Sequence, residues 1–340
     1  MNERAARGAL RWLAPALTVV LVAVFARSVD WATAWSAISH ADAMLLLVAT
    51  AANLASLAVK GIRWWLFLDA AGVPGVAPAI RATVVGAALN NVLIANGGDA
   101  ARIALVARRR NVSSARVLAT LALDRLGDAV SYAGLFVAAA FVLPLPAELA
   151  RWRLAGSIGL TLLVLSAAAL IWRGDDTRPE DTLEPVAAGA GVGTRARAYW
   201  RRLVATSTSI ASGPRMAMAL ALSFVGWAGQ WATFHYAARS AAFPISGTES
   251  LLALLTVNAS FLIRMTPGNV GVFQLLYALA AGSMGLDKNR AVAVAFLIQM
   301  IQYIPVTLVG LLLAPSLARR DVRTDPVAPT ASPTAGPKPP

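Results

Sequence analysis

Apolar residues gather in long runs along the chain, with polar and basic residues between them. A helix needs about 20 mostly apolar residues to cross a hydrocarbon layer of roughly 30 Å. Six runs come close to that length and hold almost no charge. We expect each of them to form one transmembrane helix: Trp12–Ser28, Ala43–Val59, Ala129–Ala147, Leu154–Trp172, Met216–Ala238 and Ala291–Ala314.

Two further apolar runs are interrupted by polar and turn-forming residues. Ala82–Gly98 ends in Asn-Gly-Gly, and Ser250–Leu286 is broken by Arg264 and by Thr266–Asn269. Irregular backbone at membrane depth is stable only where protein buries it or water reaches it. We therefore predict an all-α polytopic membrane protein with six spans and two re-entrant or broken hairpins. Eight spans is the alternative, because Ser250–Leu286 is also long enough to cross twice.

Composition agrees with a membrane protein. Of the 340 residues, 58% are apolar and 14% are charged, whereas soluble domains average about 45–50% apolar and about 25% charged residues. Lys and Arg number 30 against 17 Asp and Glu, which gives a net charge of +13. Because basic residues of membrane proteins concentrate in cytoplasmic loops, this excess orients the chain and does not require a nucleic acid partner.

The positions of the basic residues predict which side of the membrane each loop faces. Lys60 and Arg63, followed by the interfacial residue Trp64, close the second run, and the loop 173–215 carries seven arginines. Basic residues also flank both sides of the first broken run and follow the last span. We therefore expect a multi-pass protein of the cell membrane with both termini in the cytoplasm and with hairpins that enter from opposite sides.

The domain organisation follows from the same pattern. Residues 1–315 should form one membrane domain, with halves at about 10–172 and 216–315 joined by the cytoplasmic loop 173–215. The tail 316–340 is rich in proline and should be disordered. The chain has no cysteine and two histidines, so we expect no disulfide, no metal centre and no cofactor.

The two broken runs resemble each other. An offset of 173 residues, about half of the chain, places Asn96 on Asn269 and Gly98 on Gly271. Two alanine-rich helices can share such matches by chance, so coincidence is the alternative to an internal repeat. An inverted repeat is favoured by the topology, because the hairpins enter from opposite sides and inverted repeats with broken helices form the substrate sites of many transporters.

Charged residues at membrane depth need a physical reason, because each costs about 2.5–3.5 kcal/mol on insertion scales. Asp99 and Arg102 follow the first break at a spacing that allows an ion pair on one helix face. Asp124 and Asp128 share a face at the entrance to the third span, where they repel each other unless a cation such as Arg125 or Arg102 lies between them. The alternative is a set of interfacial caps, with Asp99 complementing a helix dipole.

A third polar group surrounds the second break. Glycines there allow close approach of the backbone, and free N–H groups can hold an anion such as phosphate, to which Arg264 would add a forked donor. A snorkelling arginine beside a tight turn is the alternative. Gln299, Gln302 and Tyr303 form a polar stripe on the last span, which could line the same cavity or bond between helices. The chain has no HExxH, GxSxG, Walker A or Rossmann signature.

These segments resemble those of the lysylphosphatidylglycerol synthase transmembrane, or flippase-like, family. The resemblance rests on Asn90–Leu93, Gly98–Arg102, Asp124–Asp128 and Pro267–Gln274, and it covers roughly residues 10–315. It implies the translocating membrane region of that family. We expect no soluble aminoacyl-transferase domain, because the tail is too short to hold one. The family often has glutamate where this chain has Gln274, which cannot ionise.

The leading hypothesis is a translocase for a phospholipid or a lipid-linked anionic substrate. The alternatives are a membrane-embedded enzyme acting on lipid-linked sugars or phosphates, with Asp99, Asp124 and Asp128 as ligands of a divalent ion, and a scaffold for a separate synthase or transferase. No catalytic residue is assigned. The candidate substrate-binding residues are Asn91, Asp99, Arg102, Asp124, Arg125, Asp128, Arg264, Pro267, Gly268, Asn269, Gly271, Gln274 and Gln299.

Overall fold

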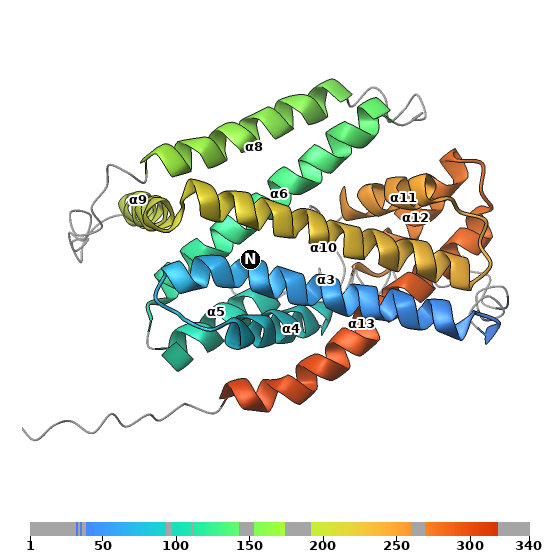
Figure 1. Cartoon of the computed structure of the whole chain (residues 1–340), viewed down its shortest axis with the longest axis horizontal. Helices are drawn as coiled ribbons and strands as arrows, with labels where there is room; N and C mark the ends of the chain where they lie inside the picture. The colour runs from blue at the N-terminus through green and yellow to red at the C-terminus, as the bar shows by residue number, and fades with distance from the viewer. Residues whose placement is uncertain are drawn as a thin grey trace, which may run out of the picture.

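Helices account for all regular structure in the described part of the chain. The computed structural model describes residues 32, 35, 39–92, 97–110, 112–142, 153–173, 192–259 and 269–318, which leaves out the predicted first span and the tail from residue 319 on. The helices (Figure 1) are α3 Ala43–Ala70, α4 Val76–Val92, α5 Gly97–Arg110, α6 Ser114–Val142, α8 Arg153–Arg173, α9 Val192–Ile210, α10 Gly213–Ser240, α11 Gly247–Ala259, α12 Val272–Ser283 and α13 Lys288–Ala318.

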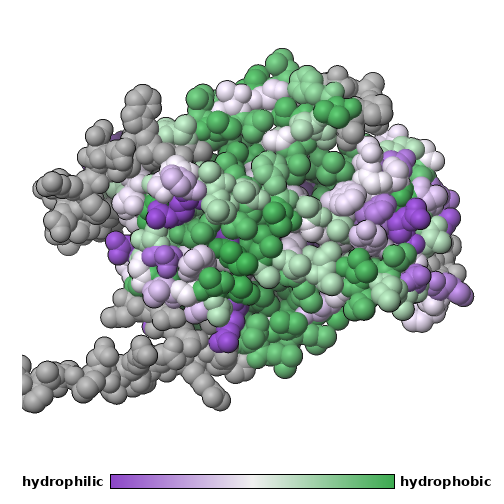
Figure 2. All heavy atoms as spheres, in the orientation of Figure 1, coloured by the Kyte–Doolittle hydropathy of each residue, from purple (hydrophilic) through white to green (hydrophobic). Residues whose placement is uncertain are grey.

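Length and composition identify these helices as those of a membrane protein. Within the described residues, three stretches are long and apolar enough to span a bilayer: α3, α6 and Lys288–Ala314 of α13. The surface in Figure 2 has an apolar belt across the middle and polar residues gathered at the two ends. The expectation of an all-α membrane protein is confirmed.

Two helix boundaries differ from the sequence prediction. The second span was expected to close at Lys60, but α3 continues to Ala70 and buries Arg63 and Trp64. The third was expected to begin at Ala129, but α6 begins at Ser114. The charges that marked the predicted ends face one another across these two helices, so neither helix has to end before them.

Helices α3 and α10 run antiparallel through the centre of the molecule (Figure 1). The amide of Asp42, the cap of α3, donates to the carbonyl of Ser240 at the end of α10, 2.9 Å away. In the middle, a Cβ added at Gly229 would lie 3.0 Å from the Cβ of Ser56. The two positions are 173 residues apart, so the predicted repeat offset relates residues that touch.

The two hairpins leave from opposite ends of the α3–α10 pair. Helix α4 follows the end of α3, and α6 returns there, because Thr120 accepts a hydrogen bond from the indole of Trp64 at 3.0 Å. Helix α11 follows the end of α10, and α13 begins there, because Arg290 donates to the carbonyl of Ala242 at 3.0 Å. The α4–α5 and α11–α12 hairpins therefore start at opposite ends of the α3–α10 pair, while their entry from opposite sides of the membrane stays a prediction.

Helix boundaries repeat at nearly constant spacing. The starts of α3, α4, α5 and α6 precede those of α10, α11, α12 and α13 by 170, 171, 175 and 174 residues. Each half also contributes most of one apolar core. One cluster contains residues of α10, α11, α12 and α13 together with Ala49 of α3, and the other contains residues of α3, α4, α5 and α6 and packs against the end of α13. The same four-helix plan is thus built twice with opposite orientation, which is an inverted repeat.

Helix α9 is an element that the sequence analysis missed within the loop 173–215. It lies between α8 and α10 in the chain and runs across the bundle, since Figure 1 shows it end-on while α3, α8 and α10 lie lengthwise. Its arginines interrupt the apolar residues, so a search for long apolar runs passes over it. Helical periodicity, with Trp200, Leu203, Val204 and Ser207 on one face, is the signal that could have found it.

Candidate functional site

Three helices of the first half bring their charged residues into one buried cluster. Arg63 of α3 donates through Nε to Asp124 of α6 at 2.7 Å and through Nη1 to Asp128 at 2.8 Å. The same Nη1 also donates to Ser223 of α10 at 2.7 Å. Only 2% of the Arg63 side chain is exposed. The repulsion expected between the two carboxylates is therefore relieved by a residue that the sequence analysis treated as a flanking charge.

Arg102 of α5 approaches the cluster less closely. Its Nε lies 3.5 Å from Asp99, and its Nη2 lies 3.7 Å from Asp124. Neither nitrogen has a hydrogen-bond partner among the described residues, although both are buried. The guanidinium stacks on Trp64, with 4.5 Å between its carbon and the ring centroid. A buried donor without an acceptor is costly, so Arg102 has the capacity to bind an additional acceptor.

Asp99 joins the hairpin to α6. It accepts from Arg125 at 2.5 Å and from the side-chain amide of Asn90 at 3.5 Å. The Asn90 carbonyl oxygen in turn accepts from the amide of Gly98 at 2.9 Å. Asn90 therefore links the end of α4 to the first turn of α5 across the break, and Asp99 is held at the start of α5, where a negative charge suits the helix dipole.

Close packing at Gly98 fixes this hairpin. A Cβ there would lie 1.9 Å from the carbonyl oxygen of Gly86 and 2.7 Å from the backbone nitrogen of Asn90. We expect Gly98→Ala to destabilise the protein by about 1–3 kcal/mol, measured as a lower midpoint of thermal unfolding in detergent. Gly134→Ala in α6 is the control, because nothing lies within 4 Å of a Cβ there. Equal midpoints for the two variants would contradict the tight crossing.

The cluster carries an excess of positive charge. Lys60 of α3 interacts electrostatically with Asp128 and lies 6.0 Å from the ring of Trp227. Four cationic side chains, Lys60, Arg63, Arg102 and Arg125, thus stand against three carboxylates, Asp99, Asp124 and Asp128. With every group ionised, the formal net charge of this partly buried ion cluster is +1, and an excess of positive charge favours an anionic ligand.

The fold itself does not require these charges. At the repeat offset of 173, the positions of Asp99, Arg102, Asp124 and Asp128 are occupied by Val272, Leu275, Leu297 and Ile301. The second half forms the same helices with apolar residues at these positions. Buried ion pairs are in general weak contributors to stability, so the formation of these helices does not by itself explain the charges of the first half.

Polar residues of the second half form a neutral site around the α12 turn. Asn269 and Gly271 adopt positive φ angles of 58° and 90°. Gln274 accepts from the amide of Gly271 at 2.8 Å and donates to Gln299 of α13. In this arrangement, a side-chain amide forms a hydrogen bond with the backbone of the turn and a second amide holds the first. Arg264, Pro267 and Gly268 lie outside the described residues, as does Asn96, so a substrate site formed by the two breaks stays a prediction.

Amide side chains also join the two halves along their common axis. Gln230 of α10 donates to Asn53 at 3.3 Å and to Ser56 at 3.1 Å on α3, and it accepts from Gln302 of α13 at 2.9 Å. Part of the predicted stripe on the last span thus bonds between helices. Asn91 lies apart from the ion cluster, where it donates to Thr307 of α13 at 3.2 Å.

The carboxylates do not converge on a common point as metal ligands do. In the part of the chain that the structure describes, no group of three or more His, Cys, Asp or Glu side chains could hold a metal ion. Asp99, Asp124 and Asp128 each face a guanidinium instead.

Fold and site together define an all-α, multi-pass membrane protein with a buried cationic cluster beside a re-entrant hairpin. The family model described as lysylphosphatidylglycerol synthase TM region matches residues 11–310. The chain belongs to this family, which places it among membrane proteins of lipid metabolism or transport. No curated protein matches the chain.

Proposed function

We propose that this protein is a translocase that moves a phospholipid or a lipid-linked anionic substrate across the cell membrane. The observation that carries the proposal is the ion cluster with its formal net charge of +1, in which the buried Nε and Nη2 of Arg102 lack hydrogen-bond partners in the described part of the chain. A phosphate oxygen is a suitable acceptor for both, because a guanidinium binds phosphate in a forked geometry.

The inverted repeat supplies a route for movement. Two halves of opposite orientation can rock against each other around a site at their interface, which gives alternating access. Ser223 of α10 contacts Arg63 of α3 at 2.7 Å, so the ion cluster borders the interface between the halves. Small residues there, such as Gly229 against Ser56, allow close contact of the helices that would move.

In this proposal, Asp99, Asp124 and Asp128 orient the arginines of the ion cluster. They hold Arg63 and Arg125 by hydrogen bonds of 2.5–2.8 Å, so that these guanidinium groups are already oriented before a substrate binds. Pre-orientation lowers the entropic cost of binding. The neutral amides at Gln274 and Gln299 would line the opposite half without adding charge.

A proteoliposome assay tests the function directly. The purified chain is reconstituted into vesicles that contain fluorescent phosphatidylglycerol or fluorescent phosphatidylcholine, and movement between leaflets is followed by dithionite quenching. We expect faster movement of the anionic lipid than in protein-free vesicles, and a smaller acceleration for the zwitterionic lipid. If folded protein accelerates the movement of neither phosphatidylglycerol nor a lipid-linked phosphate between the leaflets, the proposal is wrong.

A further inference from the structure

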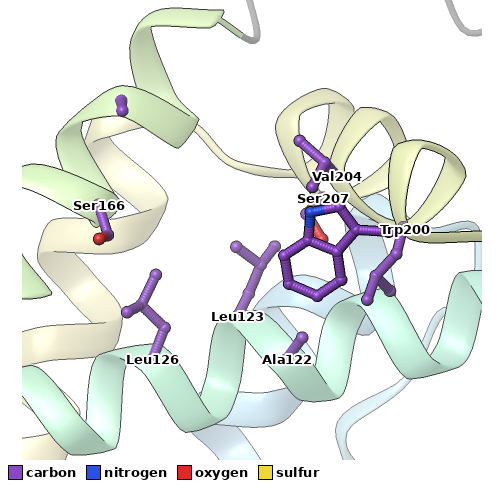
Figure 3. A pocket seen from close by; sticks show the side chains of 9 residues that line it. Ala122, Leu123, Leu126, Ser166, Trp200, Val204 and Ser207 are labelled. Carbon is purple, nitrogen blue, oxygen red and sulfur yellow. The ribbon is translucent and has the colours of Figure 1, made fainter. Parts of the chain in front are cut away.

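An apolar cavity lies on the other side of α6 from the ion cluster. Its volume is about 440 Å³, within the roughly 300–1,000 Å³ of small-molecule sites. Three helices line it: α6, α8 and α9. The lining residues are Ala122, Leu123, Leu126, Ser166, Ala169, Trp200, Leu203, Val204 and Ser207. Figure 3 shows the indole of Trp200 beside Ala122 and Leu123, with Ser166 across the cavity.

One polar side chain of this cavity is already hydrogen-bonded within its own helix. Ser166, the serine contributed by α8, donates to the carbonyl of Leu162 in its own helix at 2.7 Å. Most of the remaining lining is aliphatic or aromatic. The cavity is therefore suited to a hydrocarbon chain, which an apolar wall binds without hydrogen bonds.

Helix α9 has the properties of a helix at a membrane surface. Its cavity-lining residues follow the i, i+3, i+4, i+7 pattern of one apolar face. Trp200 is 63% exposed and Tyr199 is 50% exposed, which is typical of aromatic residues at the headgroup level. Arg197 and Arg201 are also exposed and lie next to the apolar face by helical periodicity. Such a helix binds anionic lipid surfaces through its basic side.

The ion cluster and the cavity occupy different faces of α6. Ala122 and Leu126 line the cavity, whereas Asp124 and Asp128 face Arg63 on the other side. A lipid in the cavity would therefore leave the ion cluster untouched while it contacts the helix that holds two of the carboxylates.

We infer that this cavity is a binding site for one acyl chain of an anionic phospholipid, with the headgroup held by Arg197 and Arg201 of α9. The chain inserts between α6 and α8, and the phosphate stays at the membrane surface beside Trp200. The bound lipid fastens α9 to the membrane domain. This inference does not rest on the proposed function, because such a lipid stays in place and is not moved.

Photolabelling tests the site without measuring transport. The full chain is reconstituted in phosphatidylcholine vesicles that contain a minor amount of phosphatidylglycerol with a diazirine on one acyl chain, and labelled peptides are mapped after irradiation. We expect labels on Leu126, Leu203 and Val204. Labels spread evenly over the exposed apolar residues of the other helices, with none enriched at the cavity, would overturn the inference.

Filling the cavity provides the decisive comparison. Ala169→Trp and Ala122→Phe introduce bulk from two different helices, and we expect each to reduce labelling of α9 about fivefold or more. Val164→Trp is the matched control, because Val164 is exposed on the side of α8 that does not line the cavity. Unchanged labelling in both filled variants, with elution profiles and unfolding midpoints like the wild type, would overturn the inference.

The binding of an anionic headgroup by Arg197 and Arg201 is tested separately. The double variant Arg197→Gln, Arg201→Gln should lower the preference for the phosphatidylglycerol probe over a matched phosphatidylcholine probe about fivefold or more, since each basic residue near a surface contributes that much to binding of anionic lipid. Arg81→Gln, an exposed change on α4, should leave the preference intact. Equal labelling by both probes in the wild type would overturn the assignment of an anionic headgroup.

Discussion

Replacing Arg63 with glutamine is expected to lower the free energy of unfolding by about 3–5 kcal/mol, the typical cost of removing one partner from a buried ion pair. Arg63 makes the only hydrogen bonds from an arginine to Asp124 and Asp128 within the described residues, at 2.7 and 2.8 Å. Without it, Asp124 has Arg102 at 3.7 Å as its remaining ion-pair partner there. The measurement is the midpoint of thermal unfolding in detergent.

A double variant separates lost charge compensation from lost packing. Arg63→Gln with Asp124→Asn removes a positive and a negative charge together, so it should recover part of the lost stability. Arg81→Gln, an exposed change of the same type, should leave the midpoint nearly unchanged. If Arg63→Gln unfolds at the same temperature as Arg81→Gln, the cluster is not the buried structural unit that its geometry indicates.

Much of the fold could be predicted from the sequence because membrane helices can be recognised from their length and their apolar composition. The predicted runs at Leu154–Trp172, Met216–Ala238 and Ala291–Ala314 coincide with α8, α10 and α13. The ends of α3 and α6 could not be predicted in the same way. Their charged residues compensate one another across the bundle, and a prediction made from each segment by itself treats each charge as exposed to water.

The repeat shows what weak sequence similarity can reveal. A match of Asn96 to Asn269 and of Gly98 to Gly271 gave the offset, and the starts of the helices follow it within three residues. The matched glycines nevertheless differ in structure, because Gly98 lies within α5, whereas Gly271 has a φ of 90° just before α12.

The candidate site was only partly accessible from the sequence. Asp99, Arg102, Asp124, Arg125 and Asp128 lie in one cluster, and all were chosen because charge at membrane depth is costly. Arg63 and Lys60 were missed because basic residues at the end of an apolar run are usually topological signals. The signal that could have found them is the pair of carboxylates at i, i+4, which needs a nearby cation. Arg125, the candidate beside this pair, bonds Asp99 instead, so the cation has to come from another helix.

The second large effect is expected on activity and not on stability. Arg102→Gln should slow the movement of anionic lipid in proteoliposomes about tenfold or more, because it removes the two unbonded donors and reduces the net charge of the ion cluster from +1 to zero. Folding should survive, since Asp99 keeps Arg125 at 2.5 Å and Asp124 keeps Arg63 at 2.7 Å. The measurement pairs initial rates with unfolding midpoints.

Three comparisons make this result interpretable. Arg116→Gln removes the same charge from an exposed position at the start of α6 and should transport like the wild type, which excludes an effect of overall charge. Arg102→Lys keeps the charge and loses the forked geometry, so its rate should fall between the two. If Arg102→Gln transports at the wild-type rate, Arg102 does not hold the substrate. If instead its unfolding midpoint falls as far as that of Arg63→Gln, the residue is structural, because its charge is then needed to keep the three carboxylates buried.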